Sequence, residues 1–174
     1  HSAGFEHSYL PNAEVTLKEL GLEHGWNVRT THKCEAISKD RLKDLDVLIF
    51  ATTGELPLTP AQKRLILGFV KRGKGFVGIH NATDTCYKWK GYGKMIGGYF
   101  NGHPWSEEVG VIVEDRKHPA TCHLPKTFKV LEEVYTFKEW SRKKTRVLMS
   151  LDKKSVDAGK GNRKDKDYAM AWCH

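Results

Sequence analysis

Two short apolar runs with one amphipathic segment between them constrain the fold of this chain most. The runs are residues 46–52 (DVLIFAT) and 75–80 (GFVGIH). Between them, Thr59-Pro60-Ala61-Gln62 has the pattern of a helix N-terminus with a capping box, and Gly73 is predicted to end the helix. Near-continuous apolar runs are typical of parallel strands that are covered on both faces. The segment therefore predicts a strand, helix, strand unit with a right-handed crossover.

The rest of the chain also alternates between helical and strand patterns. Apolar spacing predicts helices over 11–24, 38–45 and 91–100, and strands over 26–31, 109–113, 128–137, 145–151 and 168–172. This alternation indicates an α/β protein with a doubly wound sheet. With 174 residues, 39% of them hydrophobic, the chain suits a single domain over 1–174. We expect that domain to lack its first strand and its C-terminal end.

Charge and composition bear on the partners of this chain. The formal net charge is +8, but much of the excess lies in 138–146 and 153–166, which also contain Asp, Gly and Ser. Such charge runs are typical of solvated surface, so we expect no nucleic-acid partner. No apolar run has the roughly 18 residues of a membrane span, so no membrane partner is expected. A homo-oligomer stays open.

The N-terminus and the cysteines bear on the compartment. The first residues lack the order of a signal peptide, which favours a cytoplasmic location, with a periplasmic or secreted one open if a signal was removed. The four cysteines form no C-x-x-C pair, and we expect reduced, mostly buried thiols; they are Cys34, Cys86, Cys122 and Cys173.

Polar, chemically capable residues follow the second apolar run directly. His80 ends this run and Asp84 comes four residues later. Because ligands of open α/β sheets bind at the carboxyl edge of the strands, we expect a site built around His80. Further groups that can act as acid, base or metal ligand near neutral pH are His7, His103, Glu133 and His174.

Cofactor motifs are absent from the sequence. There is no H-E-x-x-H, C-x-x-C or His-x-His motif, so no metal is assigned, although a divalent metal such as zinc stays open if distant residues assemble a site. No phosphate-binding glycine loop follows a predicted strand. Aromatic residues are frequent after His80, and their rings suit sugar faces as well as the edges of a core; they include Tyr87, Trp89, Tyr92, Tyr99, Trp105, Tyr135 and Trp140.

Several short motifs, taken together and in order, resemble the ThuA-like (trehalose-utilisation) family. They are Phe5-Glu6-His7, Gly75 to His80 with Asp84-Thr85 and Trp89, Ile96-Gly97-Gly98, Phe100 with His103-Pro104, His118 to Thr121, Glu132 to Tyr135 and Ala171 to His174. The resemblance covers nearly the whole chain. It implies the fold of class I glutamine amidotransferases, a flavodoxin-like three-layer α/β/α sandwich with a mostly parallel, doubly wound sheet.

The resemblance also implies a function. Amidotransferases carry a nucleophilic cysteine on a strained turn at the end of the equivalent strand, and here that position resembles His80, so no glutaminase activity is expected. The family resemblance implies a carbohydrate-metabolism enzyme, a lyase or hydrolase that acts on 3-keto-glucosides or disaccharides by acid/base chemistry. In this scheme His80 is the base, Glu133 or His103 is the acid, and the substrate-binding residues are His7, Asp84, Trp89, Tyr135 and His174.

Two other classes of function stay open. A non-catalytic sugar-binding or regulatory module would need the aromatic residues but not the ionisable ones. A metal-dependent hydrolase would use His7, His80, His103 or His174 as ligands.

Overall fold

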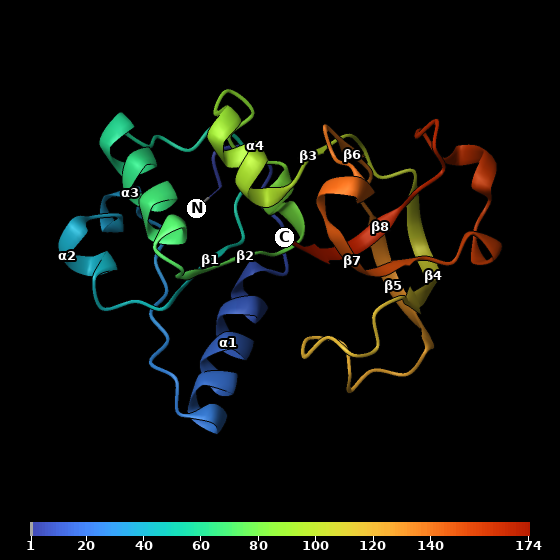
Figure 1. The fold of residues 1–174 in the computed structure, drawn as a ribbon, viewed down its shortest axis with the longest axis horizontal. Helices are drawn as coiled ribbons and strands as arrows, with labels where there is room; N and C mark the ends of the chain where they lie inside the picture. The colour runs from blue at the N-terminus through green and yellow to red at the C-terminus, as the bar shows by residue number, and fades with distance from the viewer. Residues whose placement is uncertain (1) are drawn as a thin grey trace. The chain divides into compact units, whose positions relative to one another are not determined.

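The computed structural model describes residues 2–174, which divide into two compact units, unit 1 up to Ile96 and unit 2 from Gly97 to His174 (Figure 1). Helices and strands occur together, so the predicted α/β class is confirmed, whereas the single domain stays a prediction. Within residues 2–174, none of the helices combines the length and the apolarity that a membrane span requires.

Unit 1 contains most of the helices. Its elements are α1 (Leu10–His24), η1 (Cys34–Ala36), α2 (Lys39–Leu42), β1 (Val47–Phe50), α3 (Pro60–Lys71), β2 (Gly75–Gly78), η2 (His80–Thr83) and α4 (Lys90–Ile96). The predicted strand over 26–31 is wrong, because this segment pairs with no strand and runs as irregular chain after α1. A strand persists only where a neighbour accepts its backbone hydrogen bonds, and the side chain of Trp26 is 60% exposed.

The predicted strand, helix, strand unit is present in unit 1. β1 and β2 pair in parallel, from Val47 opposite Gly75 to Phe50 opposite Gly78, with α3 between them in sequence. The capping box is confirmed, because the Thr59 hydroxyl accepts from the Gln62 backbone N–H while the Gln62 side chain accepts from the Thr59 backbone N–H.

Only one face of this ribbon is covered. Phe50 contacts Phe76 and stacks at 6.2 Å from the ring of Tyr92 in α4. Val47, Ile49 and Val77 are 46%, 40% and 45% exposed. The expectation that these strands are covered on both faces is therefore wrong for the described residues, because side chains alternate between the two faces of a strand and only one face meets the helices.

Unit 2 is built on antiparallel strands. β4 (Trp105–Val113), β5 (Thr127–Val134), β7 (Arg146–Leu151) and β8 (Ala169–Cys173) form a sheet in the order β5-β4-β7-β8, and β3 (Tyr99–Phe100) pairs with β6 (Phe137–Lys138). Trp105, Val109 and Val134 form the centre of its core. The four strands predicted downstream of residue 100 are confirmed in type, and the helix predicted over 91–100 ends at Ile96.

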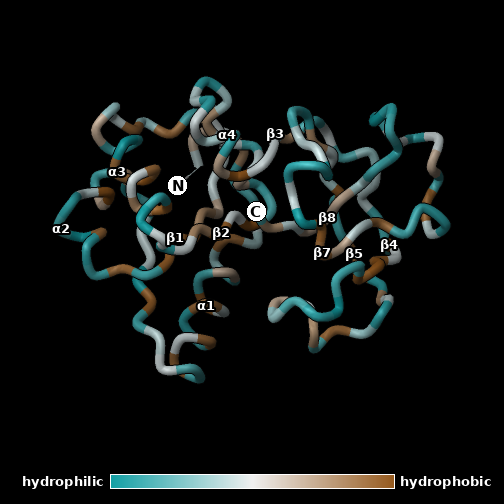
Figure 2. The backbone as a smooth tube through the Cα atoms, in the orientation of Figure 1, coloured by the Kyte–Doolittle hydropathy of each residue, from teal (hydrophilic) through white to brown (hydrophobic). Residues whose placement is uncertain are grey.

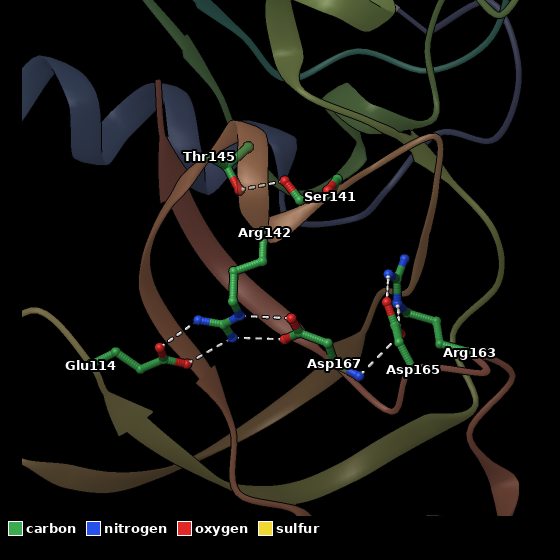
Figure 3. A network of polar contacts seen from close by, with 7 residues as sticks. All are labelled: Glu114, Ser141, Arg142, Thr145, Arg163, Asp165 and Asp167. Carbon is green, nitrogen blue, oxygen red and sulfur yellow. Dashed lines mark hydrogen bonds and ion pairs between the residues drawn. The ribbon is translucent and has the colours of Figure 1, made fainter.

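The charged loops of unit 2 are tied down by ion pairs. The segment after β7, with the short helices η4 (Lys153–Ser155) and η5 (Ala158–Lys160), is largely hydrophilic (Figure 2). In η3 (Arg142–Lys144), the Arg142 guanidinium bonds both carboxylate oxygens of Glu114 at 2.6 and 3.0 Å and both of Asp167 at 2.6 and 2.7 Å (Figure 3). These carboxylates raise the pKa of Arg142. Part of the basic excess is thus neutralised locally.

Candidate functional site

The chain turns sharply where β2 ends, and we call residues 78–84 the His80 turn. The backbone N–H of Ile79 still bonds the Phe50 carbonyl at 2.8 Å, as in the ribbon, but His80 already begins η2. His80 has a φ of +43°, a left-handed conformation that is uncommon for a residue with a side chain. Such backbone strain occurs preferentially at functional sites, where the surrounding packing holds it.

Close packing holds the His80 turn in place. A Cβ atom at Gly78 would lie 2.7 Å from Ile96 Cδ1 and 3.1 Å from Ala82 Cβ, so only glycine fits between the turn and α4. The Thr85 hydroxyl, just after the turn, donates to the carbonyl of Thr52, just after β1, at 2.5 Å and ties the two segments together. The backbone that carries the His80 imidazole is therefore held in a fixed position.

The N-terminal loop brings a second imidazole to this turn. Thr53, just after β1, accepts the Ala3 N–H at its carbonyl and donates its hydroxyl to the Phe5 carbonyl at 2.5 Å. The loop so anchored places the His7 ring at 4.9 Å from the His80 ring, edge to face. His7 and His80 thus lie together in unit 1, although the two residues are 73 positions apart, and their roles stay predictions.

Two residues of this site, Tyr9 and Asn81, were not predicted from the sequence. The Tyr9 ring lies 5.6 Å from the His80 ring, and its hydroxyl donates to Asn81 Oδ1 at 2.5 Å. Asn81 is fully buried, and its Nδ2 has no hydrogen-bond partner among residues 2–174. The position of Asn81 next to His80 in the sequence could have indicated that it belongs to the site, whereas only the tertiary structure places Tyr9 there.

Asp84 and Trp89 lie in different surroundings. Asp84 ends η2, is half-buried and accepts the Tyr87 hydroxyl at 2.5 Å. Trp89 packs between Lys63 of α3, whose Nζ lies 5.5 Å from the ring centroid, and Tyr92 of α4 at 5.7 Å. The contacts of Trp89 are thus those of a helix-packing residue, and its role in substrate binding stays a prediction.

The other predicted residues belong to unit 2. His103 is exposed and stacks on the buried ring of Tyr135, with the ring centroids 6.0 Å apart and 24° between the planes. Phe100 joins this stack at 4.3 Å from Tyr135. The structure therefore brings His103 and Tyr135 together.

Glu133 lies on a strand of unit 2, and His174 follows the last strand. Glu133 is half-buried on β5, opposite Ser106 of β4. His174 is exposed, and its Nε2 lies 3.5 Å from the position that a Cβ of Gly97 would take. The roles of Glu133 as acid and of His174 in substrate binding stay predictions.

The metal-binding capacity of each unit is limited. His7 and His80 could supply two imidazole ligands, whereas a structural zinc site usually has four ligands and a catalytic one three plus water. Among residues 2–174, no three potential ligands from a single unit lie close enough to share an ion. A metal is therefore still unassigned.

Comparison with known proteins identifies the family. The family model ThuA, described as trehalose utilisation, matches residues 1–174. The crystal structure of a ThuA-like protein from Bacteroides uniformis ATCC 8492 superposes with a TM-score of 0.80 and 25% sequence identity, covering 99% of this chain and 74% of that chain. The search of curated proteins gives no match. Since the family model spans the whole sequence, the chain belongs to the ThuA (trehalose utilisation) family.

Proposed function

We propose that this protein is a carbohydrate-metabolism enzyme that acts on 3-keto-glucosides or disaccharides by acid/base chemistry, with His80 as the base. The observation that carries the proposal is the His80 turn, because a histidine in a left-handed conformation lies two residues after the end of β2, with the His7 ring 4.9 Å away. Membership of the trehalose-utilisation family supports a sugar as substrate. We also propose that the β1–β2 ribbon belongs to a flavodoxin-like, doubly wound sheet.

The chemistry of a keto-sugar suits an imidazole base. A ketone at C3 acidifies the C–H bond at C2, and a neutral imidazole can remove that proton near neutral pH. The electron pair left at C2 then expels the glycosidic oxygen from C1, and a second acid protonates this leaving oxygen. The products are an unsaturated keto-sugar and a free alcohol.

The second acid is a residue of unit 2 in this proposal. Glu133 and His103 are the two candidates for this acid, and the proposal does not choose between them. The stacked rings of His103 and Tyr135 form a platform of the kind that suits the apolar face of a sugar ring. His7, Asp84, Trp89 and His174 complete the proposed binding set.

The His80→Asn variant tests the proposal best. Asn tolerates the left-handed conformation of residue 80 better than most residues, so the backbone of the turn is preserved while the base is lost. General-base catalysis contributes about 10²- to 10⁴-fold, so kcat on a 3-keto-glucoside should fall by that factor. The exposed His32, which pairs with Glu14, gives the control variant His32→Gln, with unchanged activity.

A second readout isolates the proton-transfer step. The wild-type enzyme in D₂O should incorporate deuterium at C2 of the recovered 3-keto-glucoside, and His80→Asn should not. Full activity of His80→Asn, or deuterium incorporation by His80→Asn equal to that of the wild type, would contradict the role of His80 as the base.

A metal-dependent hydrolase is the second candidate, favoured by the proximity of the His7 and His80 imidazoles. It predicts that dialysis against a chelator abolishes activity and that Zn²⁺ restores it. The acid/base proposal predicts equal activity before and after dialysis.

A further inference from the structure

A thiol and an imidazole meet in unit 2, among residues for which the proposed chemistry has no use. Cys173 of β8 has its Sγ 3.8 Å from His118 Nε2, although the two residues are 55 positions apart. Cys173 is half-buried, and all four cysteines are free. We propose that Cys173 is a peroxide-sensitive thiol, a modification site activated by His118.

Hydrogen bonding determines which nitrogen of His118 carries the proton. The backbone N–H of Ala120 donates to His118 Nδ1 at 3.2 Å, so Nδ1 must be an acceptor. In a neutral ring the proton then lies on Nε2, the nitrogen that faces Cys173. The same arrangement argues against a shared metal ion, because a metal would need a free lone pair on Nε2.

The loop that carries His118 is fixed to the sheet. Asp115 Oδ1 accepts the backbone N–H groups of Lys117 and His118 at 3.0 and 3.1 Å, while Oδ2 accepts Arg146 Nε at 2.6 Å. Arg146 on β7 is the register partner of Cys173 on β8. Two attachments therefore hold the imidazole beside the sulfur.

The other three cysteines differ in burial or in the contact that the sulfur makes. Cys34 and Cys86 are buried, and this burial raises the pKa of both thiols. Cys122 is exposed, but its Sγ contacts the Pro119 carbonyl at 3.5 Å, an acceptor rather than a donor. At Cys173 an imidazole N–H faces the sulfur, and such a donor stabilises negative charge on the sulfur.

The proposed reaction with hydrogen peroxide is a two-electron oxidation. The Cys173 thiolate attacks one peroxide oxygen, the S–O bond forms, and the O–O bond breaks. The departing hydroxide takes up a proton to become water. The sulfur ends as a sulfenic acid, which a thiol can reduce again.

The test follows each cysteine in the folded protein by dimedone labelling and peptide mass spectrometry during exposure to hydrogen peroxide. We expect Cys173 to react about tenfold faster than Cys122. A hydrogen bond to a charged group stabilises the charged form by about this factor, and at Cys173 the charged form is the thiolate. In guanidinium chloride the two rates should become equal. A wild-type Cys173 that reacts no faster than Cys122 would overturn the proposal.

The His118→Asn variant separates activation from mere exposure. The Asn carbonyl can accept the N–H two residues onward, as His118 Nδ1 accepts that of Ala120, but Asn offers no N–H at the Nε2 position. Cys173 should then slow about tenfold, with the Cys122 rate as internal control. An unchanged Cys173 rate in a folded variant would refute the role of His118.

Discussion

One chemical change, the removal of a tyrosine hydroxyl, should have opposite effects at two buried positions. The Tyr9 hydroxyl bonds Oδ1 of the fully buried Asn81 at 2.5 Å. Because Asn81 Nδ2 has no hydrogen-bond partner among residues 2–174, Tyr9→Phe would leave both polar atoms of the side-chain amide without one. An unsatisfied buried acceptor costs about 1–3 kcal/mol, and we expect Tyr9→Phe to lower the free energy of unfolding by about 2 kcal/mol.

Tyr168 provides the matched comparison. Its side chain is 3% exposed, and its hydroxyl has no hydrogen-bond partner among residues 2–174. Tyr168→Phe keeps the ring contact with Trp105 and removes a polar atom that gains nothing from burial. The free energy of unfolding should therefore stay unchanged or rise by up to about 1 kcal/mol.

Urea unfolding measures both changes, and hydrogen exchange with mass spectrometry assigns each to its unit. Tyr9→Phe should accelerate exchange around 79–85, and Tyr168→Phe should not accelerate exchange anywhere. Equal destabilisation by the two variants would refute the reasoning. The expected sign of each change in the free energy of unfolding depends only on whether the tyrosine hydroxyl has a hydrogen-bond partner.

Two further predictions concern backbone strain and acid stability. Gly54→Ala should lower the free energy of unfolding by about 2–4 kcal/mol, because φ is +75° and the new Cβ would lie 2.6 Å from the Ala3 carbonyl carbon and oxygen. Gly25→Ala, at φ +72° with nothing within 4 Å of the new Cβ, should lower it by only about 1 kcal/mol. Equal losses of stability in thermal unfolding would contradict the clash at Gly54. Burial alone would raise the pKa of Glu114, but hydrogen bonds from Arg142 and Ser150 lower it below its usual range. A lowered pKa in the folded state stabilises the fold above the ordinary carboxyl range and loses that effect as the pH falls through the folded pKa. Arg142→Gln should thus lower stability by about 1 kcal/mol at pH 7, after allowance for solvent screening, and the difference from wild type should shrink as the pH falls through the folded pKa of Glu114; a difference that stays constant in acid would show that charge is not its cause.

Local patterns explain what could be predicted from the sequence. The capping box at Thr59 and Gln62 involves groups three residues apart, so residue identity and spacing suffice. The strands 47–50 and 75–78 and their parallel pairing follow from apolar runs joined by a helix. The position of His80 two residues after the end of the second strand follows from the same pattern.

The failed predictions concern contacts between distant segments. The segment 26–31 has a strand-like composition but no neighbour to pair with. Val47 and Ile49 belong to an apolar run, yet they are exposed, because coverage of a strand depends on the elements packed against it. The helix predicted over 91–100 ends at Ile96, because Gly97 has a φ of +94°.

The sequence by itself determined the strand, helix, strand unit and the placement of His80 at its end, since these depend on residues close together in the chain. Only the tertiary structure decided that His80 has a positive φ, that His7 and Tyr9 lie against it, and that His118 faces Cys173. The contacts join residues 55 to 73 positions apart. Packing of the whole unit selects such pairs, and no local propensity encodes them.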